Sequence, residues 1–204
     1  MLYNYREVIE IYGTDYKLKK AIASKEIYRI ESGIYSDQKD NFTNHELVLK
    51  KYPAAFLVKN SALYHIGFIE VEPDVIHLGT ARNALRIHDR RIKQHFYSNI
   101  ANEKNGDQLI HSHINDETEN EIRLLNLTGL FVDIINDRKK YSKQELITIL
   151  EKFRDCTYFA DDKLDEEEFI WRLLDDMQIF NLVEDICREA NMRKWIKADE
   201  LEDI

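Results

Sequence analysis

Nine residues decide the fold of the N-terminal part: Ile27-Tyr28-Arg29-Ile30-Glu31-Ser32-Gly33-Ile34-Tyr35. Apolar and polar residues alternate along this stretch, and a period of two residues is that of a β-strand. The Ser32-Gly33 pair interrupts the alternation and is typical of a turn or a bulge. The stretch therefore predicts a short β-ribbon.

Two helices are predicted before this ribbon. Apolar and aromatic residues at positions 5, 8, 9 and 12 share one helical face, and Gly13 is a natural stop. Thr14 or Asp15 can cap a second helix over residues 16–23, and three lysines of that helix lie outside its apolar stripe. Helix, basic helix and β-ribbon is the order of a small winged helix. In such a unit the basic helix enters the major groove of DNA and the ribbon contacts the backbone.

The formal net charge of the 204-residue chain is −9, and it is unevenly distributed. Lysine and arginine exceed aspartate and glutamate by 2 in residues 1–60, the two balance in 61–113, and residues 114–204 carry −11. The N-terminal part can therefore approach a phosphate backbone, whereas the C-terminal part is repelled by one.

Composition predicts a cytoplasmic protein with no membrane partner. No apolar run approaches the roughly 20 residues of a membrane span, and the stretch from Met1 to Arg6 lacks the apolar core of a signal peptide. Cys156 and Cys187 lie far apart without a second cysteine nearby, so we expect ordinary buried thiols and no disulfide or metal site on them.

The chain resembles the AbiEi family of antitoxins and transcriptional regulators over roughly residues 1–100. The matching elements are the ribbon end at 32–35, the Tyr52-Pro53 step, the helix Ser61-Ala62-Leu63-Tyr64-His65-Ile66-Gly67 and the following Glu72-Pro73-Asp74. The resemblance is weaker over 122–154, where Glu121-Ile122-Arg123 splits a Glu-Arg pair that the family tends to carry. The acidic tail after Asp155 matches no part of the family.

The resemblance implies an antitoxin and autoregulator. AbiEi-like proteins pair an N-terminal winged helix, which represses their operon, with a C-terminal domain that helps to neutralise a nucleotidyltransferase toxin. The expected partners are thus operator DNA and such a toxin, and no cofactor is expected. Family members also occur as lone regulators. In the matching helix, Ser61 is expected to cap the N-terminus and Gly67 to end it, which is a structural role.

Two sets of basic residues are candidate DNA contacts. The resemblance assigns the first set to the basic helix and the ribbon: Lys17, Lys19, Lys20, Lys25 and Arg29. The second set is the densest basic cluster of the sequence: Arg82, Arg86, Arg90, Arg91 and Lys93. This second set is either a further phosphate-contacting patch, a docking site for an acidic partner, or a polar surface of a strand and turn.

The chain shows no readable catalytic site, so we expect neither a catalytic residue nor a metal site. His65 is interpreted as a histidine of structural role. His111 and His113 alternate, so they would face one side of a strand and could bind a metal, but no nearby residue completes a ligand set. Asp116 and Glu117 follow in what reads as a loop into a helix.

The predicted fold class is α+β. Residues 1–42 form the winged-helix-like DNA-binding unit, and 43–204 form a mixed domain with strands to about 115 and helices after it. One expected helix spans about 122–135. A second begins at Ser142, which forms a capping box with Glu145, and the apolar stretches near 169–174 and 180–186 are expected to be helical as well.

Two alternatives to the antitoxin hypothesis remain open. The short helix-turn-helix and the acidic C-terminal part are also compatible with a protein-interaction module that has lost DNA binding. A metal-dependent hydrolase or nuclease would use His65 or the pair of His111 and His113.

Overall fold

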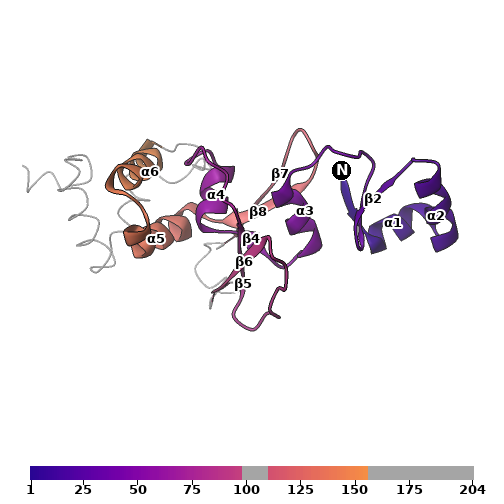
Figure 1. Cartoon of the computed structure of the whole chain (residues 1–204), viewed down its shortest axis with the longest axis horizontal. Coiled ribbons are helices and arrows are strands. Elements are labelled where there is room, and N and C mark those ends of the chain that lie inside the picture. The colour runs from indigo at the N-terminus through magenta and orange to yellow at the C-terminus, as the bar shows by residue number, and fades with distance from the viewer. Residues whose placement is uncertain (98–109, 156–204) are drawn as a thin grey trace, which may run out of the picture. The chain divides into compact units, whose positions relative to one another are not determined.

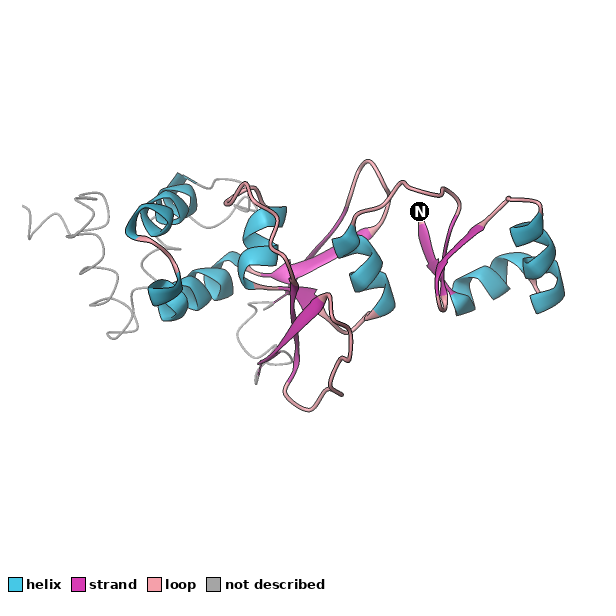
Figure 2. Cartoon of the chain, viewed as in Figure 1, coloured by secondary structure: helices cyan, strands magenta, loops and turns pink. Residues whose placement is uncertain are grey.

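The computed structural model of the protein describes residues 1–97 and 110–155. The chain divides into two compact units. Among the described residues, the first unit comprises 1–62, 72–97 and 110–126, and the second comprises 63–71 and 127–155. The described residues form α-helices and two β-sheets, so the predicted α+β class is confirmed (Figure 2).

The N-terminal part contains the predicted helix, helix and ribbon, and adds a strand that the sequence did not suggest (Figure 1). Its three strands form an antiparallel sheet of order β1-β3-β2. Ser32 and Gly33 connect β2 to β3, Gly33 has a φ of +78°, and the register shifts between Arg29 and Glu31. Ser32-Gly33 is therefore the turn, and the bulge lies before it, at Ile30 of β2. The elements are β1 (Leu2–Asn4), α1 (Tyr5–Tyr12), α2 (Asp15–Ala23), β2 (Tyr28–Glu31) and β3 (Ile34–Ser36).

Local signals fix the ends of both N-terminal helices. Asn4 caps α1 in a capping box with Glu7, and Gly13 ends the helix with a φ of +80°. Thr14 caps α2 through a hydrogen bond from the backbone N–H of Lys17. The helices pack with the sheet around a small core of Val8, Leu18, Ala21, Ile27 and Tyr35.

The second sheet belongs to the same unit and has the order β6-β5-β4-β8-β7. Its β5–β6 and β4–β8 pairs are parallel, and the other two pairs are antiparallel. Gly79 on β5 lies opposite Phe56 on β4, and a Cβ at residue 79 would approach the ring to 2.5 Å. The elements from this part of the chain are α3 (Asn44–Lys51), β4 (Phe56–Leu57), α4 (Lys59–His65), β5 (Ile76–Ala81), β6 (Ile92–Tyr97), β7 (Ile110–Ile114) and β8 (Glu121–Leu125).

The predicted helix over 122–135 is wrong in its first part. Residues 121–125 form β8, which lies between β4 and β7, so strands continue to 125 and the loop at Asp116 and Glu117 leads into a strand. Ile122 and Leu124 are fully buried on one face of β8, and Arg123 faces the other way towards α3. Backbone pairing with two neighbours therefore overrides the helical spacing of the apolar residues.

The described part of the second unit is helical. It contains α5 (Leu127–Asp137), a short 3₁₀ helix (Arg138–Lys140) and α6 (Lys143–Asp155). The capping box at the start of α6 is confirmed: the backbone N–H of Ser142 donates to Glu145 and that of Glu145 donates to Ser142. Phe153 packs edge-to-face against Phe68 and Phe131. The predicted helices near 169–174 and 180–186, the acidic runs beside them, Cys156 and Cys187 lie outside the described residues.

The expected role of Ser61 is corrected, and that of Gly67 is confirmed. Helix α4 begins at Lys59, so Ser61 lies inside it and its Oγ accepts a hydrogen bond of 2.8 Å from the backbone N–H of His77. Gly67 follows the helix with a φ of +76°, and the backbone N–H of Phe68 donates to the carbonyl of Leu63. This is the Schellman arrangement of a helix C-terminus.

Candidate nucleic-acid interface

Helix α2 carries a solvent-exposed stripe opposite its buried face. Leu18 and Ala21 are each 3% exposed and belong to the small N-terminal core. Residues spaced i, i+3, i+4 and i+7 share one face of a helix, and the exposed residues at that spacing are Tyr16, Lys19, Lys20 and Ala23. Lys17 is also exposed, on the flank of this stripe. We call Tyr16, Lys19, Lys20 and Ala23 the α2 stripe.

The cations of the first candidate set have no carboxylate partners in the part of the chain that the structure describes. Lys17, Lys19, Lys20, Lys25 and Arg29 are all exposed, and none makes an ion pair within the described residues. The one acid of α2 is Asp15, whose Oδ1 accepts a 2.6 Å hydrogen bond from the hydroxyl of Tyr5. This bond raises the pKa of the Tyr5 phenol. The structure therefore keeps these five charges available to an external anion.

Lys25 and Arg29 extend the cationic segment beyond α2. Lys25 follows the helix in the left-handed conformation, with a φ of +62°. The backbone N–H of Lys25 donates to Ile22 and that of Glu26 donates to Ala21, which again is a Schellman arrangement. Arg29 is exposed on β2, opposite Tyr35 of β3. All five cations thus come from one segment that runs from α2 into the ribbon.

The second candidate set is split by the structure. Arg91 donates from Nη1 to Glu31 at 2.5 Å and from Nη2 to Asp89 at 2.7 Å, and Lys51 Nζ lies 3.0 Å from Glu31 and 3.2 Å from Asp89. We call these four residues the ion-pair cluster. The other members of the set are exposed and make no ion pair within the described part of the chain: Arg82, Arg86, Arg90 and Lys93. Arg91 therefore acts within the protein, and only the remaining four can face a partner.

The ion-pair cluster ties three segments of the first unit together. Glu31 ends β2, Lys51 ends α3, and Asp89 and Arg91 precede β6. Hydrogen bonds from Arg91 hold the pKa of Asp89 and that of Glu31 below their ordinary values. The bonds to Asp89 and Glu31 raise the pKa of Arg91, and the bond to Glu31 raises that of Lys51. All four side chains are therefore charged at neutral pH and balance one another.

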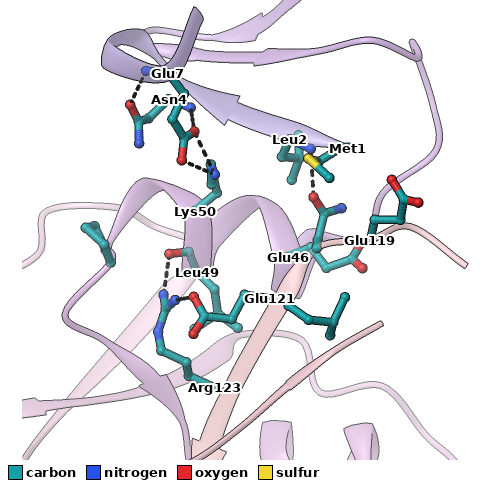
Figure 3. A pocket seen from close by; sticks show the side chains of 13 residues that line it. Met1, Leu2, Asn4, Glu7, Glu46, Leu49, Lys50, Glu119, Glu121 and Arg123 are labelled. Atoms are coloured by element: carbon teal, nitrogen blue, oxygen red, sulfur yellow. Dashed lines mark hydrogen bonds and ion pairs between the residues drawn. The ribbon is translucent and has the colours of Figure 1, made fainter. Parts of the chain in front are cut away.

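A pocket of about 230 Å³ lies where the N-terminal segment meets α3 and β8. Figure 3 shows two ion pairs in its wall: Lys50 lies 2.7 Å from Glu7, and Arg123 pairs with Glu121. Arg123 also donates to the backbone carbonyl of Leu49 at 2.7 Å. Both cationic side chains of the wall therefore have carboxylate partners already. The pocket is interpreted as part of the packing between the N-terminal segment, α3 and β8, and not as a ligand site.

Hydrogen bonds of buried polar groups also hold the same segments together. The backbone N–H of Leu2 donates to Oδ1 of the buried Asn120 at 2.7 Å. Glu46 is 1% exposed and accepts from the backbone N–H of Thr43, from Asn115 and from Thr118. These bonds attach β1 and the start of α3 to the turn between β7 and β8. The first 42 residues therefore pack directly against the part of the chain that follows them.

The three candidate histidines occupy one strand and one helix end. His111 and His113 lie on the same side of β7 with ring centroids 5.8 Å apart, as the alternation predicts. Burial, and then His111, lower the pKa of His113. Among residues 1–97 and 110–155, no three His, Cys, Asp or Glu side chains could hold a metal ion together. His65 is half-buried at the end of α4.

Sequence reasoning missed two kinds of residue. The partners of Arg91 include Glu31, which is 60 positions away, and no local pattern links the two. Tyr16 is not among the residues that the sequence predicts to contact DNA, yet it is 77% exposed. The helical spacing from Leu18 to Ala21 and Ile22 does place Tyr16 on the opposite face, and this signal was present in the sequence.

Comparisons with known proteins supply no family for this chain. No protein-family model matches it, and no curated protein sequence matches it significantly. None of the helices in the described residues has the length and the apolar composition needed to cross a membrane.

Proposed function

We propose that the protein is a DNA-binding antitoxin and transcriptional autoregulator of the AbiEi type, with a cytoplasmic site of action. The observation that carries the proposal is the cationic segment of Lys17, Lys19, Lys20, Lys25 and Arg29, which is exposed and has no counter-ion among residues 1–97 and 110–155. Uncompensated cations on one helix and the adjoining ribbon are suited to the phosphates of duplex DNA.

The order of elements supports a winged-helix mode of binding. Only Gly13 and Thr14 separate α1 from α2, so α1 can serve as the supporting helix of a helix-turn-helix. Strand β1 adds a third strand to the ribbon of β2 and β3, and the ion-pair cluster anchors the end of β2 at Glu31. The ribbon packs beside the basic helix through the core of Leu18, Ala21, Ile27 and Tyr35, an arrangement compatible with a wing.

The proposed partners are operator DNA and a nucleotidyltransferase-like toxin. The charge of −11 in residues 114–204 opposes DNA binding by that part of the chain. The same charge suits a basic protein partner. It also supports the second candidate, a protein-interaction module without DNA binding, in which the acidic part performs the whole function.

Fluorescence anisotropy of the full-length protein with duplex DNA from upstream of its own gene tests the proposal. We expect binding whose affinity falls steeply with salt. The double variant Lys19→Gln/Lys20→Gln should bind more weakly, and the slope of log K against log salt should become shallower by about 2, since each phosphate contact contributes about 0.9.

A matched control is the double variant Lys139→Gln/Lys143→Gln, which removes two exposed lysines of the second unit. It makes the same change in net charge and should leave the salt slope unchanged. Equal effects of the two double variants would reduce the binding to bulk electrostatics. No binding at low salt would reject the DNA-binding proposal and leave the interaction module, which co-purification with the product of the neighbouring gene then tests.

A further inference from the structure

Tyr16 is the most exposed aromatic side chain in the described part of the protein. It is 77% exposed, against 52% for Phe96 and 47% for Tyr5. The Tyr5 hydroxyl donates to Asp15, but the Tyr16 hydroxyl has no hydrogen-bond partner among the described residues. An aromatic ring left in water contributes little to stability, because its apolar area stays unburied.

The position of Tyr16 on α2 excludes it from the core. The core-facing side of the helix is occupied by Leu18 and Ala21, with Ile22 packed beside them. Tyr16 begins the α2 stripe on the other side, followed by Lys19 and Lys20 and then by Ala23 one turn further on. The stripe therefore has an apolar group at each end and two cations between them.

This arrangement matches the chemistry of a base edge better than that of a phosphate alone. In the major groove, thymine is the one base that presents an apolar group, its C5 methyl. Lysine donates to phosphates or to the O6 and N7 acceptors of guanine. Residues near the N-terminus of a recognition helix are the ones that reach base edges, and Tyr16 is the second residue of α2.

We infer that Tyr16 is a specificity-determining residue whose ring packs on a thymine methyl in the major groove. The inference rests on the proposed function, since it requires that α2 enter DNA. The lysines of the stripe supply attraction that is insensitive to sequence, and Tyr16 supplies discrimination between bases. The ligand of the stripe is therefore duplex DNA with a thymine at a fixed position.

Selection from a random duplex library with the full-length protein tests the inference. The wild type should enrich a motif that contains an invariant thymine, Tyr16→Ala should lose the preference at that position alone, and Tyr16→Phe should keep it. Val71→Ala is a matched control, because Val71 is 78% exposed and lies outside α2. This control should enrich the wild-type motif.

A chemical substitution in the enriched DNA makes the test specific to the methyl group. Replacing that thymine by uracil removes only the methyl, and the wild type should bind about fourfold more weakly, as expected for one buried carbon. Tyr16→Ala should bind the two DNAs equally well.

The possible failures are distinct. If the wild type enriches no sequence and binds no duplex, both the proposed function and the inference fail. If Tyr16→Ala enriches the same thymine as the wild type, or still distinguishes uracil from thymine, the inference alone fails. Loss of the preference in Tyr16→Phe would also overturn it, since the hydroxyl rather than the ring would then make the contact.

Discussion

Two basic segments of this protein look alike in sequence and differ in structure. The segment from Arg82 to Lys93 has the denser run of cations, but its Arg91 is held by Glu31 and Asp89. The cations from Lys17 to Arg29 are more widely spaced, and none of them is paired within the described residues. Charge density along a sequence therefore does not show that Arg91 is engaged within the protein, whereas the other four cations of its segment are exposed and unpaired among the described residues.

The difference has a clear physical consequence. Two cations and two carboxylates neutralise one another in the ion-pair cluster, and Asp89 is 12% exposed there, so water screens the attraction only partly. The lysines of the α2 stripe are exposed and make no ion pair within the described residues, so substituting them breaks no ion pair there. Charges of the first kind stabilise the fold, and charges of the second kind are available for binding.

The largest expected effect comes from opening the ion-pair cluster. Asp89→Ala removes the carboxylate that accepts from the Arg91 Nε and Nη2 groups and from Lys51. We expect the free energy of unfolding to fall by about 2 kcal/mol, since hydrogen bonds between charged groups are lost and two cations repel each other. Urea denaturation followed by circular dichroism measures the change.

Substitutions of the lysines in the α2 stripe should, by contrast, leave the free energy of unfolding almost unchanged. Lys19→Gln/Lys20→Gln should change stability by less than about 0.5 kcal/mol, as is usual for exposed sites. Asp40→Ala, at an exposed acid outside the cluster, controls for the loss of one negative charge. A similar loss of stability in all three variants would show that the cluster has no special role.

Acidification should weaken the ion-pair cluster and leave the α2 stripe unaffected. Because Arg91 lowers the pKa of Asp89 and Glu31 in the folded protein, the unfolded chain takes up protons first as the pH falls. Their contribution to stability is complete above the ordinary carboxylate pKa values of about 4 and is lost as the pH drops through the lowered ones.

The measurement is urea denaturation between about pH 5 and pH 3, a range set by the ordinary carboxylate pKa values. The double variant Glu31→Gln/Asp89→Asn should lose about 1 kcal/mol less than the wild type over this range, a figure reduced for the partial exposure of both groups. Identical pH dependence of the two proteins would show that the cluster does not couple protonation to folding.

Local signals in the sequence predicted most helix ends correctly and the long-range partners poorly. The caps at Thr14 and Ser142 depend on residues within one turn, and both are present, whereas the cap expected at Ser61 is not. Residues 121–125 differ from the predicted helix because β8 pairs with β4, which is distant in sequence, as well as with the preceding strand β7. Long-range pairing, unlike a helix cap, leaves no mark at a fixed spacing.

The same distinction applies to the candidate site. The cations of α2 are visible in the sequence, and their exposure follows from the apolar spacing of Leu18 and Ala21. The engagement of Arg91 depends on Glu31, which the fold alone brings near. The sequence shows which residues are charged. It does not show which counter-ion a residue binds when that counter-ion lies on another helix or strand.

One substitution at Lys25 separates the effect of charge from that of backbone strain. A lysine with a φ of +62° occupies a conformation that costs a side-chain-bearing residue about 1 to 2 kcal/mol, and glycine adopts it freely. Glycine also loses about 0.5 to 1 kcal/mol more entropy on folding. Lys25→Gly should therefore raise the free energy of unfolding by about 0.5 kcal/mol, whereas Lys19→Gly, inside α2, should lower it by about 1 kcal/mol.

If Lys25 also contacts a phosphate, the more stable variant Lys25→Gly should bind DNA more weakly, with a salt slope reduced by about 1. One substitution would then raise the free energy of unfolding and lower the affinity for DNA, as expected for a charge that binds a partner and does not stabilise the fold. A loss of stability in Lys25→Gly would contradict this and would place Lys25 with the structural cations of the ion-pair cluster. Thermal denaturation and anisotropy on the same sample distinguish the two results.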